Sequence, residues 1–287
     1  MTTTMTEERT GGTDAARRAR SGRLDLGVRS ATESPAVSDL RGLRPLIVFV
    51  DGVGDPGSPE ATRSALLCAW AITWDGRRAL LSLAQGCKDG TASCRAFFSD
   101  LKRRGLADPV LVVTDGESPL LRASEICFPT ALTQRCLGHH MRFLGCRLPQ
   151  GASGLVLHAV RAACEAPSPA AADALRRDVA RRHAAAFPSL VAYFDLTLDS
   201  CTTHLHLPRS LHRVARTTLV AEWILAARRR LTEEGGDPSR APFGLEALRD
   251  ALELVLEEGG GITIGEEERV HLEALEACTA RGARRAG

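Results

Sequence analysis

The clearest pattern in the chain is a series of short apolar runs separated by polar turn residues. Two of these runs flank the dipeptide Asp75-Gly76. Two apolar runs around an Asp-Gly pair predict a β-hairpin, because this dipeptide suits the tight turns that join antiparallel strands. In total the runs predict five strands, at residues 46–51, 68–74, 77–83, 110–115 and 131–134.

Other segments repeat their apolar residues at helical spacing. In residues 92–104, the apolar positions are Cys94, Phe97, Phe98 and Leu101, and Gly105 follows as an expected helix C-cap. Further helices are predicted at 119–126, 153–165, 170–187, 188–197, 214–232, 243–258 and 265–280. Strands and helices in this order predict an α/β fold, in which helices flank a mixed sheet. We expect strands 46–51 and 110–115 to lie side by side.

The pattern also divides the chain into regions. Residues 1–44 are rich in Thr, Gly, Ser and Arg without apolar periodicity, which predicts a disordered polar tail. Residues 45–258 form the expected folded core, interrupted at about 141–211 by an all-helical segment. Residues 259–287 are expected to form a C-terminal helix and an Arg/Gly tail.

Composition narrows the class of protein. The 287 residues are 44% hydrophobic and 25% charged, which is ordinary for a globular protein. No apolar run is long enough for a membrane span and the start lacks a signal-peptide pattern, so we expect a cytoplasmic protein without a membrane partner. The odd number of cysteines, nine, predicts free thiols. The net charge of +2 is small, but residues 137–213 hold nine Arg against five Asp and Glu.

Three acidic residues are the main candidates for chemistry. Asp51 and Asp115 each end an apolar run and precede a glycine, and Glu222 lies in a predicted helix. Carboxylates delivered by neighbouring strand ends and a helix can hold two Mg²⁺ ions, which stabilise the attacking and leaving oxygens of phosphoryl transfer. The competing interpretation is that each Asp-Gly is only a turn, as Asp75-Gly76 is predicted to be.

Several motifs resemble the Mutator-type insertion-sequence transposases. The run Val110-Leu-Val-Val-Thr-Asp-Gly is followed by Phe128-Pro129 and then by Gln134-Arg-Cys-Leu-Gly-His. The last of these is similar to the Gln-Arg-Cys-x-x-His motif of that family. Upstream, Val50-Asp-Gly and Trp74-Asp-Gly-Arg-Arg resemble the family's first catalytic strand and its hairpin. Downstream, Ala186-Phe-Pro-Ser and Arg216-Thr-Thr, with Glu222 beyond, resemble its later motifs.

The resemblance covers roughly residues 45–258, and it implies a fold, a catalytic site and an activity. It implies an RNase H-like fold with a five-stranded sheet and a helical insertion before the last catalytic helix. It implies a DDE site formed by Asp51, Asp115 and Glu222, loaded with Mg²⁺ or with Mn²⁺ as a substitute. Cys136 and His139 would support this site. The implied activity is DNA strand cleavage and transfer at element ends, by a homo-oligomer bound to terminal inverted repeats and target DNA, associated with the nucleoid.

The chain also departs from the family pattern. The family's Asn after Thr-Thr is Leu219 here, and the polar residues after the Glu are replaced by Trp223, Ile224 and Leu225. A polar tail stands where the family carries an N-terminal DNA-binding region, so the chain resembles a truncated copy. A decayed remnant that keeps the fold, and a structure-directed nuclease of the same fold, therefore stay open as alternatives.

Three further groups of residues suggest other kinds of site. Cys136, His139 and His140 could form a zinc site with Cys201, His204 and His206, although a supporting role for Cys136 and His139 is favoured. The run Gly52-Val-Gly-Asp-Pro-Gly matches a dinucleotide-binding fingerprint, but it lacks room for the parallel crossover that such a site needs. Arg228 and Arg229 follow Glu222 along one helix and are candidates for phosphate contacts, or for a solvated helix end.

Overall fold

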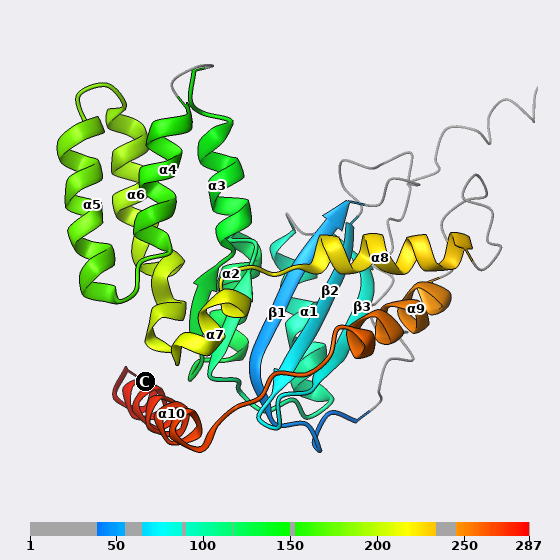
Figure 1. Ribbon diagram of the computed structural model, residues 1–287. Helices are drawn as coiled ribbons and strands as arrows, with labels where there is room; N and C mark the ends of the chain where they lie inside the picture. The colour runs from blue at the N-terminus through cyan, green and yellow to red at the C-terminus, as the bar shows by residue number, and fades with distance from the viewer. Residues whose placement is uncertain are drawn as a thin grey trace, which may run out of the picture. The chain divides into compact units, whose positions relative to one another are not determined.

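The computed structural model describes residues 39–54, 65–87, 90–116, 118–149, 153–233 and 245–286. Its centre is a five-stranded mixed sheet with the strand order β3-β2-β1-β4-β5 (Figure 1). The strands are β1 (Pro45–Gly54), β2 (Ala65–Thr73), β3 (Arg78–Gly86), β4 (Leu111–Thr114) and β5 (Leu132–Arg135). The first three pair antiparallel, and β4 and β5 run parallel to β1. The α/β class and the five predicted strands are confirmed.

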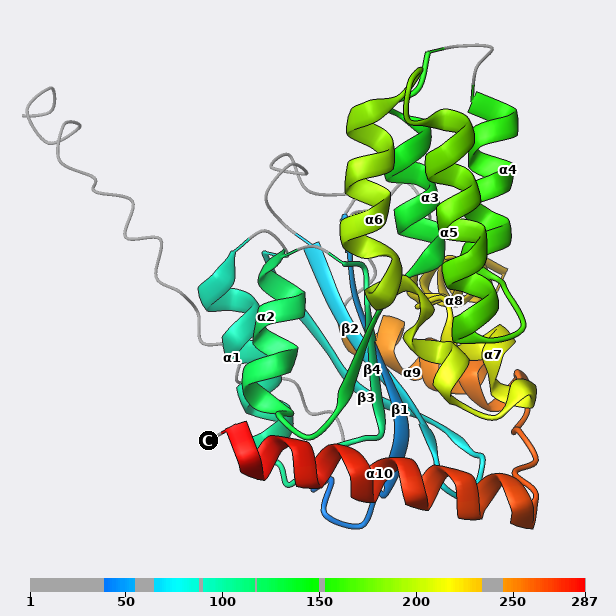
Figure 2. The ribbon, with the colours of Figure 1, turned by 90° about the vertical axis from the view of Figure 1, so that its left-hand side faces the viewer.

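Helices cover both faces of this sheet (Figure 2). One face packs against α1 (Thr91–Arg103) and α2 (Ser118–Cys127), through a buried cluster that includes Phe97, Phe98 and Phe128. The other face packs against α8 (Val220–Glu233) and α9 (Leu245–Glu258), around Phe49 and Trp70, whose rings stack at 4.1 Å. Because both faces are covered, β1 and β2 are almost continuously apolar and buried.

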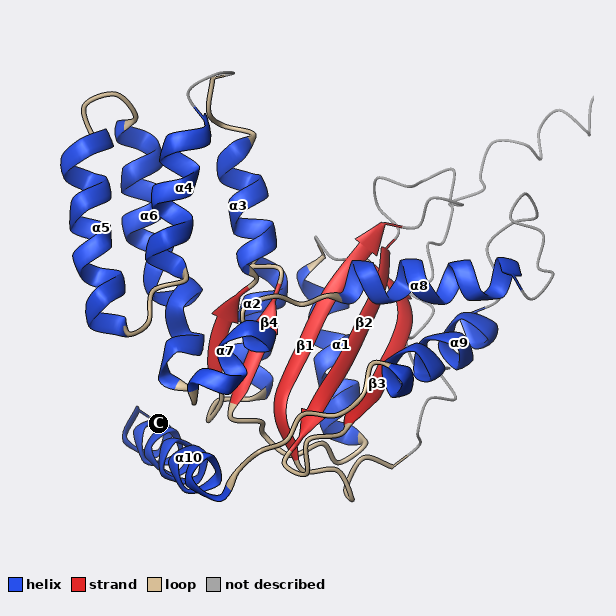
Figure 3. Ribbon diagram, viewed as in Figure 1, coloured by secondary structure: helices blue, strands red, loops and turns tan. Residues whose placement is uncertain are grey.

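The segment after β5 contains only helices among its described residues (Figure 3). Four of them pack around their own buried cluster, which includes Val160, Phe194 and Leu198. The elements of this segment are α3 (Leu137–Gly145), α4 (Ser153–Cys164), α5 (Pro169–His183), α6 (Pro188–Thr202), a 3₁₀ turn η1 (Thr203–His206) and α7 (Arg209–Ala215). The last helix, α10 (Glu266–Ala286), contacts the start of β1 and the region around η1, through the pairs Arg44–Glu276 and His271–His206.

The structure differs from the sequence prediction in two boundaries and one additional helix. Residues 1–38 of the expected tail lie outside the described residues, but Leu40 is fully buried and its N–H donates to the Arg104 carbonyl, so ordered structure begins before Pro45. Helix α3 was not predicted. The predicted helix 214–232 begins instead at Val220, because residues 214 and 215 are the end of α7 and residues 216–219 are not helical.

The structure also bears on the cysteines and on membrane-spanning helices. All nine cysteines lie in the described residues and are free thiols, as expected. None of the helices in the described ranges is both long enough and apolar enough to cross a membrane.

Candidate active site at the ends of β1 and β4

Asp51 and Asp115 lie at the same end of two adjacent parallel strands. Val50 pairs with Thr114 in the β1–β4 register, and each aspartate is the next residue. Parallel neighbours are about 4.8 Å apart, so the strands deliver both carboxylates to one place. Both residues are buried, with 1% and 7% of their surface exposed. The predicted side-by-side placement of these strands is therefore confirmed.

Asp51 is held by hydrogen bonds from two directions. The Thr218 hydroxyl donates to its Oδ2 at 2.6 Å, and the N–H of Gly52 donates to its Oδ1 at 2.7 Å. Thr218 is held in turn by the Trp70 indole, which donates to its carbonyl oxygen at 3.0 Å. One hydrogen bond to each oxygen fixes the orientation of the Asp51 carboxylate.

Cys136 and His139 lie beside Asp51, where α3 begins. The Thr218 N–H donates to Cys136 Sγ at 3.4 Å, and the Leu137 N–H donates to the Arg216 carbonyl at 2.8 Å. His139 Nδ1 lies 3.7 Å from Asp51 Oδ2. The structure thus brings the Gln-Arg-Cys-x-x-His and Arg-Thr-Thr motifs, about 80 residues apart in sequence, onto one aspartate.

The electrostatic character of this sheet end is negative. The hydrogen bond with Cys136, together with the nearby carboxylates of Asp51 and Asp115, raises the pKa of His139 to about 9 despite the opposing effect of burial. Burial raises the pKa of the Cys68 thiol on β2, and the charge of Asp51 raises it further. The pKa of Cys136 is lowered, because its contacts with His139 outweigh its burial. A site with this charge favours cations.

Glu222 lies in the first turn of α8, directly after the segment that holds Asp51. Its side chain is exposed, unlike those of the two aspartates. Among the residues that the structure describes, no three His, Cys, Asp or Glu side chains are grouped so as to hold a metal ion. Arg228 and Arg229 lie further along α8, where Arg229 is exposed and Arg228 is half-buried.

The residues of the weighed alternatives have other surroundings. Both the N–H and the ring Nδ1 of His204 approach Gln134 Oε1, at 2.9 and 3.3 Å, and His206 is exposed. β1 and β2 pair antiparallel, which is the hairpin-like arrangement and not the parallel unit of a dinucleotide site. Residues 55–57 of that fingerprint lie outside the described residues.

Three residues of the site lie in the motifs that resemble the family, but no role was assigned to them from the sequence. Thr218 holds Asp51, and the fully buried Gln134 donates from Nε2 to the Cys201 carbonyl at 2.8 Å, which ties β5 to α6. Arg135 donates from Nη1 to the Gly116 carbonyl beside Asp115. The resemblance to the Gln-Arg-Cys-x-x-His motif marked Gln134 and Arg135, but their partners, 67 and 19 residues away in sequence, could not be inferred from the local pattern.

A pocket of about 500 Å³ opens beside Asp115. It lies between the ends of β4 and β5 and the helices α3 and α6, and its lining is mainly basic and aromatic. It was not predicted from the sequence, because only tertiary packing brings Asp115 and Tyr193 to the lining residues on and around α3.

Comparison with known proteins agrees with this arrangement. The sequence model of the family described as "Transposase, Mutator family" matches residues 57–241, more than half of the chain. The chain is 29% identical over 171 residues to the transposase for insertion sequence element ISRM5 of Rhizobium meliloti (strain 1021), covering 58% of this chain and 42% of that protein. It is 26% identical over 207 residues to the transposase for insertion sequence element IS6120 of Mycolicibacterium smegmatis, covering 72% of this chain and 64% of that protein.

A third relative is the transposase for insertion sequence element IST2 of Acidithiobacillus ferrooxidans, which is 26% identical over 202 residues and covers 69% of this chain and 68% of its own length. The chain spans about two fifths to two thirds of the length of these relatives. Half or more of the chain matches the family, and the motifs that the match contains converge on Asp51 and Asp115. The chain therefore belongs to the Mutator family of transposases.

Proposed function

We propose that this chain is the catalytic part of a DNA transposase, with an RNase H-like fold, and that Asp51, Asp115 and Glu222 hold Mg²⁺ for strand cleavage and strand transfer at the ends of an insertion element. The observation that carries the proposal is the placement of two buried carboxylates at adjacent parallel strand ends. Family membership supports DNA as the substrate. In this proposal the helices between β5 and α8 are the insertion before the last catalytic helix.

Two of the three proposed ligands, Asp51 and Asp115, are well placed to hold Mg²⁺. Their carboxylate oxygens are the hard ligands that Mg²⁺ prefers, and both are buried at adjacent strand ends. Bound there, the metal would supply stabilisation of the attacking and leaving oxygens of the phosphate. Glu222 lies in the first turn of α8, the helix that follows Thr218 and Leu219, and it is the third ligand of the proposal.

The protein's own groups then have separate tasks. Thr218 and Gly52 fix the orientation of Asp51 before DNA binds. Preorganisation of this kind lowers the reorganisation needed in the transition state. Cys136 and His139 hold the Thr218 segment and the start of α3 against Asp51, so they act as positioning residues. In the active form, two or more copies of the chain would bind the terminal repeats and the target DNA together.

A catalytically decayed transposase is the second candidate. Two observations favour it: the side chain of Glu222 is exposed, and Leu219 takes a backbone conformation with φ of 54°, which suits the Asn of the resembled family better than Leu. The two candidates differ in metal binding and in chemistry, not in fold.

The test is strand nicking and joining with purified protein, Mg²⁺ or Mn²⁺, and DNA that carries the flanking terminal repeats. Wild type should cleave, and Asp51→Asn should lower the rate at least about 100-fold, as loss of a charge that stabilises a transition state does. Asp75→Asn is the matched control, since Asp75 precedes a glycine too but lies in the hairpin turn, where Asn-Gly is also well suited. Equal inactivity of wild type and Asp51→Asn would support the decayed form.

A second readout separates metal binding from turnover. Titration of Mn²⁺ into the protein, followed by calorimetry, should show binding that Asp51→Asn and Asp115→Asn each abolish and Asp75→Asn retains. Binding of Mn²⁺ without cleavage would assign the defect to the DNA-binding or assembly steps.

A further inference from the structure

Apart from Asp115 and His139, the residues that line the pocket have no role in the proposed catalytic site. Its floor includes Asp115 and Arg135 from the ends of two adjacent strands, and its walls come from α3 and α6. At about 500 Å³ it is within the usual size range of small-ligand pockets. It therefore has room for one planar group with its substituents, next to a proposed catalytic carboxylate.

Flat surfaces form one wall of this pocket. The rings of His140 and Tyr193 stack with centroids 5.8 Å apart and 18° between their planes, and Phe143 stacks on Tyr193 at 4.7 Å and 29°. The guanidinium of Arg147 lies 3.3 Å from the centre of the Phe143 ring. Aromatic rings and arginine planes are the surfaces on which unpaired nucleic-acid bases stack.

The charge of the pocket is mainly positive. Arg135, Arg142 and Arg147 all line it, against the single acid Asp115. Arg142 and Arg147 are exposed, and Arg147 also donates to the Phe143 carbonyl at 3.1 Å. A basic rim around an aromatic wall fits a ligand that has both a planar ring and phosphate groups.

His140 supplies an unsatisfied polar group in this wall. The residue is 4% exposed, and its Nε2 has no hydrogen-bond partner in the structure. Burial and the charge of Arg135 lower the pKa of His140 to about 4, so the ring is neutral at pH 7 and one nitrogen can donate while the other accepts. A buried polar atom without a partner is unfavourable, and a ligand with a polar edge would supply the missing hydrogen bond.

We propose that this pocket binds one unpaired nucleotide of the DNA strand processed at Asp115, with its base on the wall of His140, Phe143 and Tyr193 and its phosphates toward the arginines. The inference rests on the proposed function for its ligand. It goes beyond that function because it assigns a separate subsite for an unstacked nucleotide. Duplex DNA alone would not fill the pocket, since its bases are stacked and paired.

Binding measurements test the proposal without any cleavage step. Labelled blunt duplex DNA and the same duplex with a four-nucleotide single-stranded tail, carrying 2-aminopurine in the tail, are titrated with protein in EDTA, using separate 3′ and 5′ tails. One of the tailed duplexes should bind about 5- to 150-fold more tightly than blunt DNA, the range expected for one stacked base. Its 2-aminopurine fluorescence should be quenched on binding.

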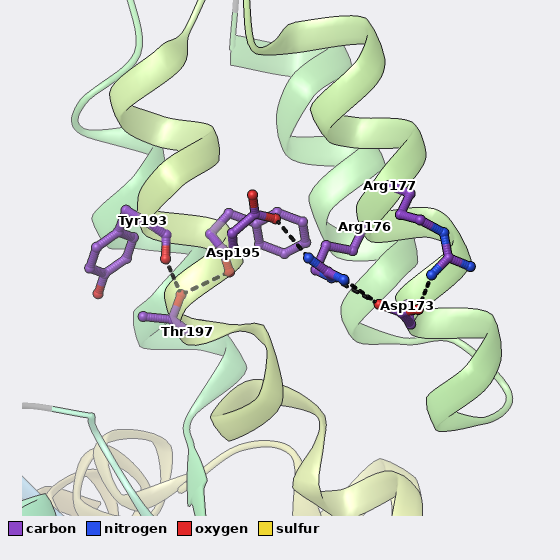
Figure 4. A network of polar contacts seen from close by, with 7 residues as sticks. Asp173, Arg176, Arg177, Tyr193, Asp195 and Thr197 are labelled. Atoms are coloured by element: carbon purple, nitrogen blue, oxygen red, sulfur yellow. Dashed lines mark hydrogen bonds and ion pairs between the residues drawn. The ribbon is translucent and has the colours of Figure 1, made fainter.

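The variants are chosen to separate the pocket from general DNA contacts. Tyr193→Ala should remove the preference for the tail and the quenching, while Tyr193→Phe should keep both. Arg142→Gln, at an exposed position, should weaken binding of the tailed duplex and lower the salt dependence of that binding by about one counterion. Arg177→Gln is the control: Arg177 is exposed and pairs with Asp173 on α5, and Figure 4 shows the Tyr193 side chain pointing away from that network.

The outcomes distinguish the two proposals. Equal binding of tailed and blunt DNA by wild type, or a tail preference that survives Tyr193→Ala with the fold intact by circular dichroism, overturns the inference even if the protein cleaves DNA. A tail preference without cleavage supports the inference while the catalytic proposal fails. Displacement of the tail by millimolar dAMP as effectively as by a free oligonucleotide would reassign the pocket to mononucleotides and overturn the strand subsite.

Discussion

At the scale of single residues, the junction before α8 decides the geometry of the site. The apolar periodicity of residues 214–232 predicts one helix, because it contains no Gly or Pro to end it. The structure interrupts that helix at residues 216–219, where the Thr218 hydroxyl binds Asp51 and the Thr218 carbonyl binds Trp70. These partners are 167 and 148 residues away in sequence, so no local pattern could have shown the break.

Leu219 carries the backbone strain of this junction, with φ of 54°. A left-handed conformation costs an L-residue with a side chain about 1–2 kcal/mol, which glycine avoids. Because Leu219 also packs against the core, Leu219→Ala and Leu219→Gly both lose that packing and differ in the strain. We expect the Gly variant to be more stable than the Ala variant by about 1 kcal/mol in urea unfolding.

A helical position provides the control, because within a helix alanine is normally more stable than glycine. At Ala221, inside α8, substitution by Gly should destabilise by about 1 kcal/mol, because glycine is unfavourable within helices. If Leu219→Ala is as stable as Leu219→Gly, the residue is not strained, and its departure from the family's Asn has no conformational cost.

At the scale of elements, the sequence predicted the strands and helices whose apolar spacing and turn residues are local signals. The hairpin of β2 and β3 followed from two apolar runs and an Asp-Gly turn, and α1 followed from its four apolar positions, all of which are buried. Helix α3 was not predicted, although Leu137, Met141 and Leu144 have helical spacing. The carboxylates could be placed on adjacent strands, but the pocket depends on how α3 and α6 pack, which is a tertiary property.

The C-terminus of α1 offers a prediction at this scale. Gly105 has φ of 91°, its N–H donates to the Lys102 carbonyl, and the Leu106 N–H donates to the Leu101 carbonyl, which is the Schellman arrangement. A Cβ at this position would also lie 2.3 Å from Cγ of Arg41. Gly105→Ala should therefore lower the free energy of unfolding by about 1–2 kcal/mol.

Gly42→Ala is the matched substitution for this measurement. Its added Cβ would meet nothing within 4 Å, and its backbone is not left-handed. Urea denaturation of both variants should show a change near zero for Gly42→Ala. A comparable loss in the two variants would mean that the cap does not stabilise the end of α1.

At the scale of the whole described fold, two buried histidines link the sheet to the helices that follow it. His140 lies on α3 beside the pocket, and His204 lies in η1, where its N–H bonds to Gln134 of β5. Burial lowers the pKa of both rings to about 4, aided by Arg135 for His140 and by His212 and Arg216 for His204. Both are therefore neutral in the folded protein at pH 5 and protonated in the unfolded chain, whose ordinary pKa is about 6.5.

The sign of the effect on stability follows from proton binding. Between pH 6.5 and 4 the unfolded chain binds more protons than the folded one, so the free energy of unfolding falls as the pH falls. At pH 5 each histidine should cost on the order of 2 kcal/mol relative to pH 7. His204→Gln should keep the small polar contact with Gln134 available and remove about half of this pH dependence, whereas His206→Gln, at the exposed position two residues on, should leave it unchanged. Urea unfolding at pH 7, 6 and 5 measures the slope, and a slope equal in wild type and His204→Gln would show that this ring is accessible to protons in the folded state.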